Sequence, residues 1–317
     1  MKAATTDGFG FNSPIKMVDT AKPEIAGHDV LVEVYASSVN PKDWKLNQTI
    51  SSLIPTIGFL KKPLLIGDDL AGVIVEKGSQ VQDFQVGDAV YGMDMHFRTA
   101  ACAEFARIDA RCIAKKPDSI SFTEAAACPL VGLTALQGLR IGKVGAGSKV
   151  LIIGASGGVG TFAVQIAKAL GARVTGVCSA KNAELVRSLG ADQIIDYTRE
   201  DVSKRQADFD TVFDVTSYQS LASCSTLLKE GGIFVSTGGN AKAIVGSVRD
   251  RLLYKRKKSK NVWVHPNTPD LEILAHYIEQ GQVRPIIDSQ YRLENIDQAY
   301  QRSKSGHCVG KVVLQVK

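Results

Sequence analysis

The chain of 317 residues lacks several features that would define its class directly. Its six cysteines are scattered, and no two form a C-x-x-C pair, which argues against a zinc cluster and against a disulfide framework. The first ten residues, MKAATTDGFG, contain no apolar run, so we expect no secretory signal. Reduced thiols and the lack of a signal together predict a cytoplasmic location, and we expect no association with a membrane.

The chain also lacks a large excess of charge, since the formal net charge is +6. The one concentration of cations is the segment YKRKKSK at 254–260, whose cations fall within 255–260, preceded by Arg249 and Arg251. One interpretation is contact with nucleic acid or an anionic membrane. The other is a solvated loop between two structural elements. No aromatic residues are interleaved for base stacking, which favours the loop.

The most informative segment that is present is VLIIGASGGVG at 150–160. Four apolar residues run into glycines spaced three apart, and a helical apolar pattern follows, so the order is buried strand, tight turn, helix. Such a turn presents backbone N–H groups and a helix N-terminus to a pyrophosphate. The spacing is G-x-x-G-x-x-G, and glycine turns also occur for structural reasons, so the signal is moderate alone. The candidate cofactor-binding residues here are Ser156, Gly157, Gly158 and Val159.

Two patterns of predicted secondary structure divide the chain. The first part is rich in short strands, such as DVLVEVYASSVN at 29–40, where apolar and polar positions alternate. The middle alternates strand and helix candidates, including a strand at 261–265, which is typical of a doubly wound parallel sheet. We therefore predict an α/β protein in which a β-rich domain, residues 1–120 and 285–317, receives an inserted Rossmann dinucleotide-binding domain, residues 121–284.

The second strand of the Rossmann unit indicates which dinucleotide fits. An NAD site usually has an acidic residue at the end of this strand, but ARVTGVCSAKN has none. Ser179 and Lys181 instead suit a 2′-phosphate, which favours NADPH. The alternatives are that Ser179 caps the next helix and that Lys181 is a solvated lysine. Tyr197 follows the next strand near the same corner, either as part of this cluster or as a packing residue.

Taken together, the chain resembles the medium-chain dehydrogenase/reductase superfamily in its zinc-free quinone oxidoreductase branch, which includes zeta-crystallin-like and enone reductase-like proteins. The segments that carry the resemblance extend over almost the whole sequence: SVNPKDWK (38–45), IGDDLAGVIVEKGSQVQDFQVGDAVYG (66–92), EAAACPLVGLTALQGL (124–139), GASGGVG (154–160), SLGADQIIDY (188–197), GGIFVSTGG (231–239) and SGHCVGKVVL (305–314).

The resemblance implies a GroES-like β-rich domain beside the Rossmann domain, with NADPH in the cleft between them. It supports Ser179, Lys181 and Tyr197 as the group that binds the 2′-phosphate. Members of this family are often dimers that pair the edge strands of their Rossmann sheets, so a homodimer is one expectation, and the strand at 261–265 would serve.

Zinc-dependent members of the superfamily use a Cys near the NPKD position and a His–Glu pair after a glycine. Here the corresponding segments read SSVNPKD and Gly67–Asp68–Asp69, with neither Cys nor His. Zinc needs three or four converging ligands, so we predict no metal site. Without a Lewis acid, a quinone or an α,β-unsaturated carbonyl is a better hydride acceptor than a simple ketone.

The resemblance also assigns candidate residues to the site of hydride transfer. Asn40 lines the nicotinamide and substrate cleft, and Thr134 faces the nicotinamide; a turn cap and a helix-interior hydroxyl are the structural alternatives. The remaining cofactor candidates are Gly238, Gly239, Val264 and Lys311, and for Lys311 the alternative is a surface lysine. His265 is a candidate acid, although a lone histidine is more often structural, and Trp44 is either a cleft wall or a core residue.

These observations predict an NADPH-dependent, zinc-independent oxidoreductase that transfers hydride to a quinone or an enone, a small-molecule substrate, with solvent supplying the proton. A second hypothesis is a cofactor-binding regulatory protein that acts through RNA or a protein partner. A third is a saturated ketone or alcohol dehydrogenase. The sequence names neither the physiological acceptor nor the oligomeric state.

Overall fold

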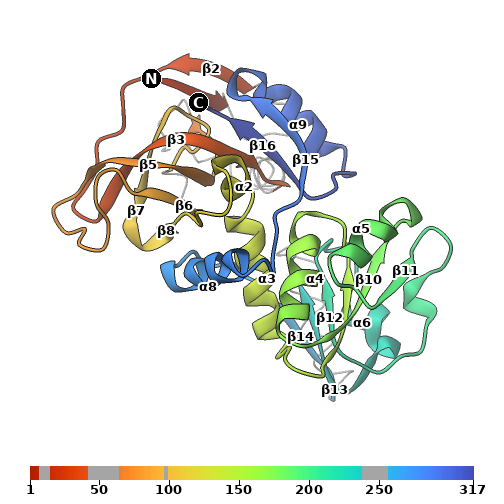
Figure 1. Ribbon diagram of the computed structural model, residues 1–317. Helices are drawn as coiled ribbons and strands as arrows, with labels where there is room; N and C mark the ends of the chain where they lie inside the picture. Colours follow the sequence, from red (N-terminus) through yellow and green to blue (C-terminus); the bar gives the residue numbers. More distant parts are fainter. Residues whose placement is uncertain (7–14, 42–63, 96–98, 238–255) are drawn as a thin grey trace, which may run out of the picture. The chain divides into compact units, whose positions relative to one another are not determined.

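The computed structural model describes residues 1–6, 15–41, 64–95, 99–237 and 256–317, and the chain divides into two compact units (Figure 1). Unit 1 contains Met1–Leu130, Pro266–Glu279 and Pro285–Lys317, and unit 2 contains Val131–His265 and Gln280–Arg284. Residues 121–130 and 266–279 therefore pack with unit 1, whereas the expected domain bounds assign them to the Rossmann domain.

Unit 1 is built from two sheets. The larger one has the strand order β15-β16-β3-β5-β6-β8, with β7 also paired to β3, and the smaller has the order β2-β1-β4. The strands of the larger sheet are β3 (Asp29–Val39), β5 (Asp69–Lys77), β6 (Ala89–Met93), β7 (Phe105–Asp109), β8 (Ile113–Lys115), β15 (Ile287–Arg292) and β16 (Lys311–Gln315). Those of the smaller sheet are β1 (Lys2–Thr6), β2 (Ile15–Asp19) and β4 (Leu64–Leu65).

Strand β3 is the centre of the larger sheet because it pairs antiparallel with β5, β7 and β16. Its apolar side chains Val30, Val32 and Val34 are buried in one core cluster with residues of β5, β6 and β7. The strand β16, near the C-terminal end of the chain, pairs with the end of β3, so residues 29–39 and 311–315 lie in one sheet.

The helices of unit 1 are short or amphipathic. Ser121 caps α2 (Phe122–Ala126) with a capping box that includes Glu124, because each residue supplies an acceptor to a backbone N–H of the other. Helix α8 (Thr268–Glu279) packs on β8, and α9 (Ile296–Lys304) packs on β15 and β16. The asymmetry of α9 is clear in its sequence, since Ile296, Ala299 and Tyr300 are buried at helical spacing.

Unit 2 contains a six-stranded sheet with the order β11-β10-β9-β12-β13-β14, and every pairing in it is parallel. This is the order of the doubly wound dinucleotide-binding fold, so the predicted fold class is confirmed. The strands are β9 (Lys149–Ile153), β10 (Arg173–Cys178), β11 (Gln193–Asp196), β12 (Phe209–Asp214), β13 (Leu228–Ser236) and β14 (Lys258–Asn261).

Helices cover both faces of this sheet. Helix α3 (Pro129–Ile141) places Gly138 against the ring of Phe213 in β12, and α4 (Gly158–Ala169) packs on β9 and β10. Helix α5 (Ala183–Ser188) packs on β10 and β11. The short helix α6 (Leu221–Cys224) contributes Leu221 and Cys224 to a separate apolar cluster with alternate residues of the same strands.

The prediction of a strand at 261–265 was wrong in its bounds, and so was that of a loop for the basic segment. The last strand of unit 2 is β14, Lys258–Asn261, so half of the basic segment 255–260 forms the sheet edge beside β13. Its lysines alternate with half-buried residues, which hides the strand from a search for apolar alternation. Charged lysines on an edge strand also discourage pairing with other chains. No helix among the described residues is long and apolar enough to span a bilayer.

Candidate functional site

The turn between β9 and α4 places three glycines in three different roles. Gly154 adopts φ +86°, a left-handed conformation that glycine accepts readily, and a Cβ there would lie 2.5 Å from Cγ2 of Thr216. A Cβ on Gly160 would overlap the carbonyl oxygen of Gly154 and approach the backbone of Ala155 at 2.8 Å. Gly160 therefore lets the first turn of α4 pack directly on the backbone of the preceding loop.

Gly157 is the N-cap of α4, and its conformation is ordinary, with φ −80°. A side chain at residue 157 would therefore need no strained backbone conformation. A Cβ would meet only the carbonyl oxygen of Gly154, at 3.5 Å, so the space above residue 157 is open. Because Gly157 has no side chain to cap the helix, the backbone N–H groups of Val159 and Gly160 receive no acceptor from the N-cap. This cradle fits a phosphate group.

The corner after β10 gathers the residues predicted to bind a 2′-phosphate. Ser179 precedes a 3-10 turn, Ala180–Asn182, but its side chain makes no capping hydrogen bond, so the structural alternative for Ser179 has no support. Lys181 is exposed on this turn. Tyr197 is 57% exposed, which does not fit a packing residue, and its N–H donates to the carbonyl of Cys178 at 3.3 Å. The three residues thus share one exposed corner of unit 2.

The corner also contains an acid, Asp196, whose carboxylate is engaged by neighbouring groups. Asp196 is the register partner of Cys178. Hydrogen bonds from the Thr198 hydroxyl and N–H hold the pKa of Asp196 below its usual value, and its charge is directed into that turn and toward Arg199, 3.5 Å away. Burial and the Asp196 charge raise the pKa of the Cys178 thiol, which therefore adds no negative charge.

The segment after β14 is held from α3. The side chain of Gln137 donates to the carbonyl of His265 at 2.7 Å and accepts from the N–H of His265 at 2.9 Å. Both ends of one amide thus fix the main chain next to Val264, and sequence reasoning missed Gln137. Thr134 is 7% exposed in the same helix. Gly238, Gly239 and Trp44 lie outside the described residues.

A second polar cluster, in unit 1, surrounds Asn40 at the end of β3. Its members are Ser38, Asn40, Asp69 and Lys311, all at most 4% exposed. Asp69 accepts from the Ser38 hydroxyl at 2.5 Å, from the Asn40 side-chain amide at 2.8 Å and from the backbone N–H of Leu130 at 2.8 Å. The same carboxylate lies 3.4 Å from the Lys311 ammonium. Sequence reasoning examined Asp69 only as a missing metal ligand.

The Lys311 ammonium also donates to the Asn40 side-chain oxygen and, at 3.2 Å, to the carbonyl of Val39. Its three N–H groups therefore have partners within unit 1. Lys311 is 4% exposed, so the alternative that it is a surface lysine was wrong. Asn40 receives a donor on its oxygen and offers its NH₂ to a carboxylate. Asp69 and Lys311 together fix which way the Asn40 amide faces.

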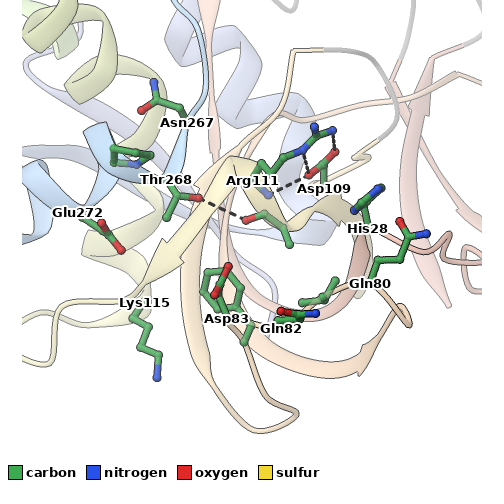
Figure 2. Close-up of a pocket in the computed structure, with 14 residues that line it drawn as sticks. His28, Gln80, Gln82, Asp83, Asp109, Arg111, Lys115, Asn267, Thr268 and Glu272 are labelled. Carbon is green, nitrogen blue, oxygen red and sulfur yellow. Dashed lines mark hydrogen bonds and ion pairs between the residues drawn. The ribbon is translucent and has the colours of Figure 1, made fainter.

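Unit 1 also has a pocket between the loops before β3 and after β5 and the start of α8 (Figure 2). His28, which lines it, precedes β3, whereas Asn40 follows β3, so eleven residues of strand, roughly 30 Å, separate the two ends. Its charged groups are partly paired, as the Arg111–Asp109 bridge in Figure 2 shows. The pocket is therefore separate from the Asn40 cluster. No group of three or more His, Cys, Asp or Glu residues in the described ranges is arranged to hold a metal.

Comparison with known proteins supports the same architecture. Residues 26–133 match the alcohol dehydrogenase GroES-like domain family, and residues 189–314 match the zinc-binding dehydrogenase family. A solved quinone oxidoreductase from Coxiella burnetii superposes with a TM-score of 0.86 at 29% identity, covering 100% of this chain and 99% of that one.

Three curated relatives extend the comparison. The chain is 31% identical to a chloroplast envelope quinone oxidoreductase homolog of Arabidopsis thaliana, covering 95% of this chain and 94% of the relative. It is 31% identical to the mitochondrial NAD(P)H oxidoreductase RTN4IP1 of Mus musculus (100% and 89% covered) and 32% identical to a 2-methylene-furan-3-one reductase of Solanum lycopersicum (99% and 79% covered).

The chain belongs to the medium-chain dehydrogenase/reductase superfamily, in the quinone oxidoreductase and enone reductase branch. It is accordingly an oxidoreductase that uses a nicotinamide cofactor. The names of two relatives place those proteins in chloroplasts or mitochondria, and the cytoplasmic location of this chain stays a prediction.

Substitutions at Gly157 and Gly160 are expected to have different effects, one on cofactor binding and the other on stability. Gly160→Ala drives a methyl group into the carbonyl of Gly154, so it should lower the free energy of unfolding by about 1–3 kcal/mol in urea titrations. Gly157→Val fills open space, so its stability should stay within about 0.5 kcal/mol of wild type, while nicotinamide dinucleotide binding is lost. Wild-type affinity in Gly157→Val would contradict the placement of the pyrophosphate.

Proposed function

We propose that this protein is an NADPH-dependent, zinc-independent oxidoreductase that reduces a quinone or an α,β-unsaturated carbonyl compound. The proposal rests on two places in unit 2 that suit an anion, in the loops that follow the adjacent strands β9 and β10. One is the open cradle over Gly157 at the N-terminus of α4, and the other is the exposed corner of Ser179, Lys181 and Tyr197.

These residues fit the pyrophosphate and the 2′-phosphate of NADPH. Backbone N–H groups of Gly158 and Val159 would hold the pyrophosphate, together with the helix dipole of α4. Ser179 would donate to the 2′-phosphate and Lys181 would add a positive charge, while the exposed ring of Tyr197 offers a hydroxyl donor at the same corner. Val264 would present main-chain groups to the carboxamide, since Gln137 holds the neighbouring residue. NADPH, when bound, supplies a hydride to the electrophilic carbon of the acceptor.

The contribution of the protein to the reaction would be orientation of the two reactants, as the family resemblance implies for Asn40 and Thr134. Asp69 and Lys311 fix the orientation of the Asn40 amide, so this residue would hold one wall of the substrate cleft without rearranging. The proton would come from solvent. A quinone or enone needs no Lewis acid, since conjugation already makes its carbon electrophilic.

The alternative of an RNA-binding or partner-binding protein rests on the basic segment. Within it, Arg256 pairs with Glu230, and Lys257 donates to the carbonyl of Ser225. Lys258 and Lys260 lie on the edge strand β14 and remain exposed. Partners within unit 2 therefore account for two of these cations, and this arrangement favours the enzyme.

Lys181 supplies the test of cofactor preference. Wild-type protein should bind NADPH at least ~10-fold more tightly than NADH, a difference of about 1.4 kcal/mol. Lys181→Ala should lower the affinity for NADPH and leave the affinity for NADH nearly unchanged, because only NADPH carries the 2′-phosphate. Fluorescence titration of both cofactors measures this. Equal affinities of the wild type for NADPH and NADH would contradict the preference.

A substrate panel tests the reaction and its independence of zinc. Purified protein should oxidise NADPH with at least one member of a set of quinones, enals and enones, and not with saturated ketones. Treatment with a chelator should leave the rate unchanged, and elemental analysis should find no stoichiometric zinc. One tightly held zinc per chain, or turnover confined to saturated ketones, would favour the dehydrogenase alternative. NADPH binding without turnover on the whole panel would favour the binding protein.

A further inference from the structure

One hydrogen bond joins the two phosphate-binding regions of unit 2. The side-chain NH₂ of Asn182 donates to the hydroxyl oxygen of Ser156 at 3.0 Å. Ser156 lies in the glycine turn after β9, one residue before the N-cap of α4, and Asn182 ends the 3-10 turn after β10. Both side chains are half-buried. The contact spans two loops that follow adjacent parallel strands.

The direction of this hydrogen bond determines which hydrogen-bonding capacity the Ser156 hydroxyl retains. A serine hydroxyl has one hydrogen and two acceptor lone pairs, so accepting from Asn182 leaves the hydrogen available to another group. Among the residues that the structure describes, no acceptor is recorded for that hydrogen. Ser156 directly precedes Gly157, the N-cap of α4, above which space for an anion is open.

The Asn182 side chain does not cap its own helix, and the Asn182 backbone is in the αR region, with φ −103° and ψ 0°. Asn182 is the N-cap residue of α5, a position where asparagine ordinarily accepts a hydrogen bond from a backbone N–H of the first turn. Its side chain makes no such bond and reaches back to Ser156 instead. The side-chain amide is thus committed to the glycine turn and not to starting its own helix.

We propose that Asn182 is a positioning residue that fixes Ser156 as a hydrogen-bond donor to the cofactor pyrophosphate. This inference rests on the proposed function, because it needs a dinucleotide at the cradle over Gly157. The pyrophosphate is common to NADPH and NADH, so Asn182 increases the affinity for both cofactors by the same factor. Lys181, its chain neighbour, acts on the 2′-phosphate and discriminates between them.

A double-mutant cycle tests the assignment. Dissociation constants for NADPH and for NADH are measured on wild type, Asn182→Ala, Ser156→Ala and the double variant. Ser156→Ala should weaken both cofactors about 10-fold, as expected for a lost hydrogen bond to a charged group. Asn182→Ala should weaken both about 3-fold. The double variant should be no weaker than Ser156→Ala, because Asn182 acts only through Ser156.

Two further variants separate the alternatives. Asn182→Asp should weaken both cofactors more than Asn182→Ala, because a carboxylate accepts the Ser156 hydrogen and withdraws it from the ligand. Lys181→Ala is the matched control on the same turn and should affect NADPH alone. Thermal unfolding without cofactor should be unchanged in Asn182→Ala, since no helix cap is lost.

Additive losses in the double variant, or a loss confined to NADPH in Asn182→Ala, would overturn the inference and place Asn182 in direct contact with the cofactor. Unchanged affinities in Asn182→Ala would overturn it as well, while the proposed function stands. Wild-type protein that binds neither NADPH nor NADH would instead defeat the proposed function, and the inference with it.

Discussion

The close approach of two backbone segments at Gly160 is the constraint on which unit 2 depends. A side chain at this position would overlap the carbonyl of Gly154, so only glycine lets α4 begin directly over the end of β9. The consequence is chemical as well as structural. The first N–H groups of α4 lie at the carboxyl edge of the parallel sheet, at the point where the strand order reverses. The strands β10 and β11 follow on one side of β9, and β12, β13 and β14 follow on the other. With no side chain at Gly157 to cap them, these donors are left for a ligand.

Unit 1 uses the opposite device, a fully satisfied buried network. Asp69 has no contact with water, and its carboxylate gathers a hydroxyl, two N–H groups and an ammonium group. Charges are costly to bury unless they are paired and hydrogen-bonded in this way. Here the pairing fixes the Asn40 amide, at a position where the family resemblance places the substrate. An amide that is already held in one orientation would need no reorganisation when a substrate binds beside it.

Much of the fold could be predicted because its signals are local. The apolar run into the glycines indicated the strand β9 and the start of α4. The missing acid after β10 predicts a 2′-phosphate site at Ser179 and Lys181, and this stays a prediction. The errors have physical reasons. Strand β14 alternates lysine with small polar residues, so apolar periodicity cannot detect it. Asp69, Gln137 and Asn182 act through partners at least 26 positions away in the chain, and a single sequence carries no signal of such pairings.

The central claim is that a hydride passes from a nicotinamide to a carbon made electrophilic by conjugation. Its most direct test is turnover of an enone in ordinary water with NADPH that carries deuterium at C4, using each stereospecifically labelled form in turn. The account predicts that one form delivers deuterium to the β-carbon of the product, while the α-carbon gains hydrogen from solvent. A product without deuterium from either form, or saturation that proceeds without NADPH oxidation, would contradict it.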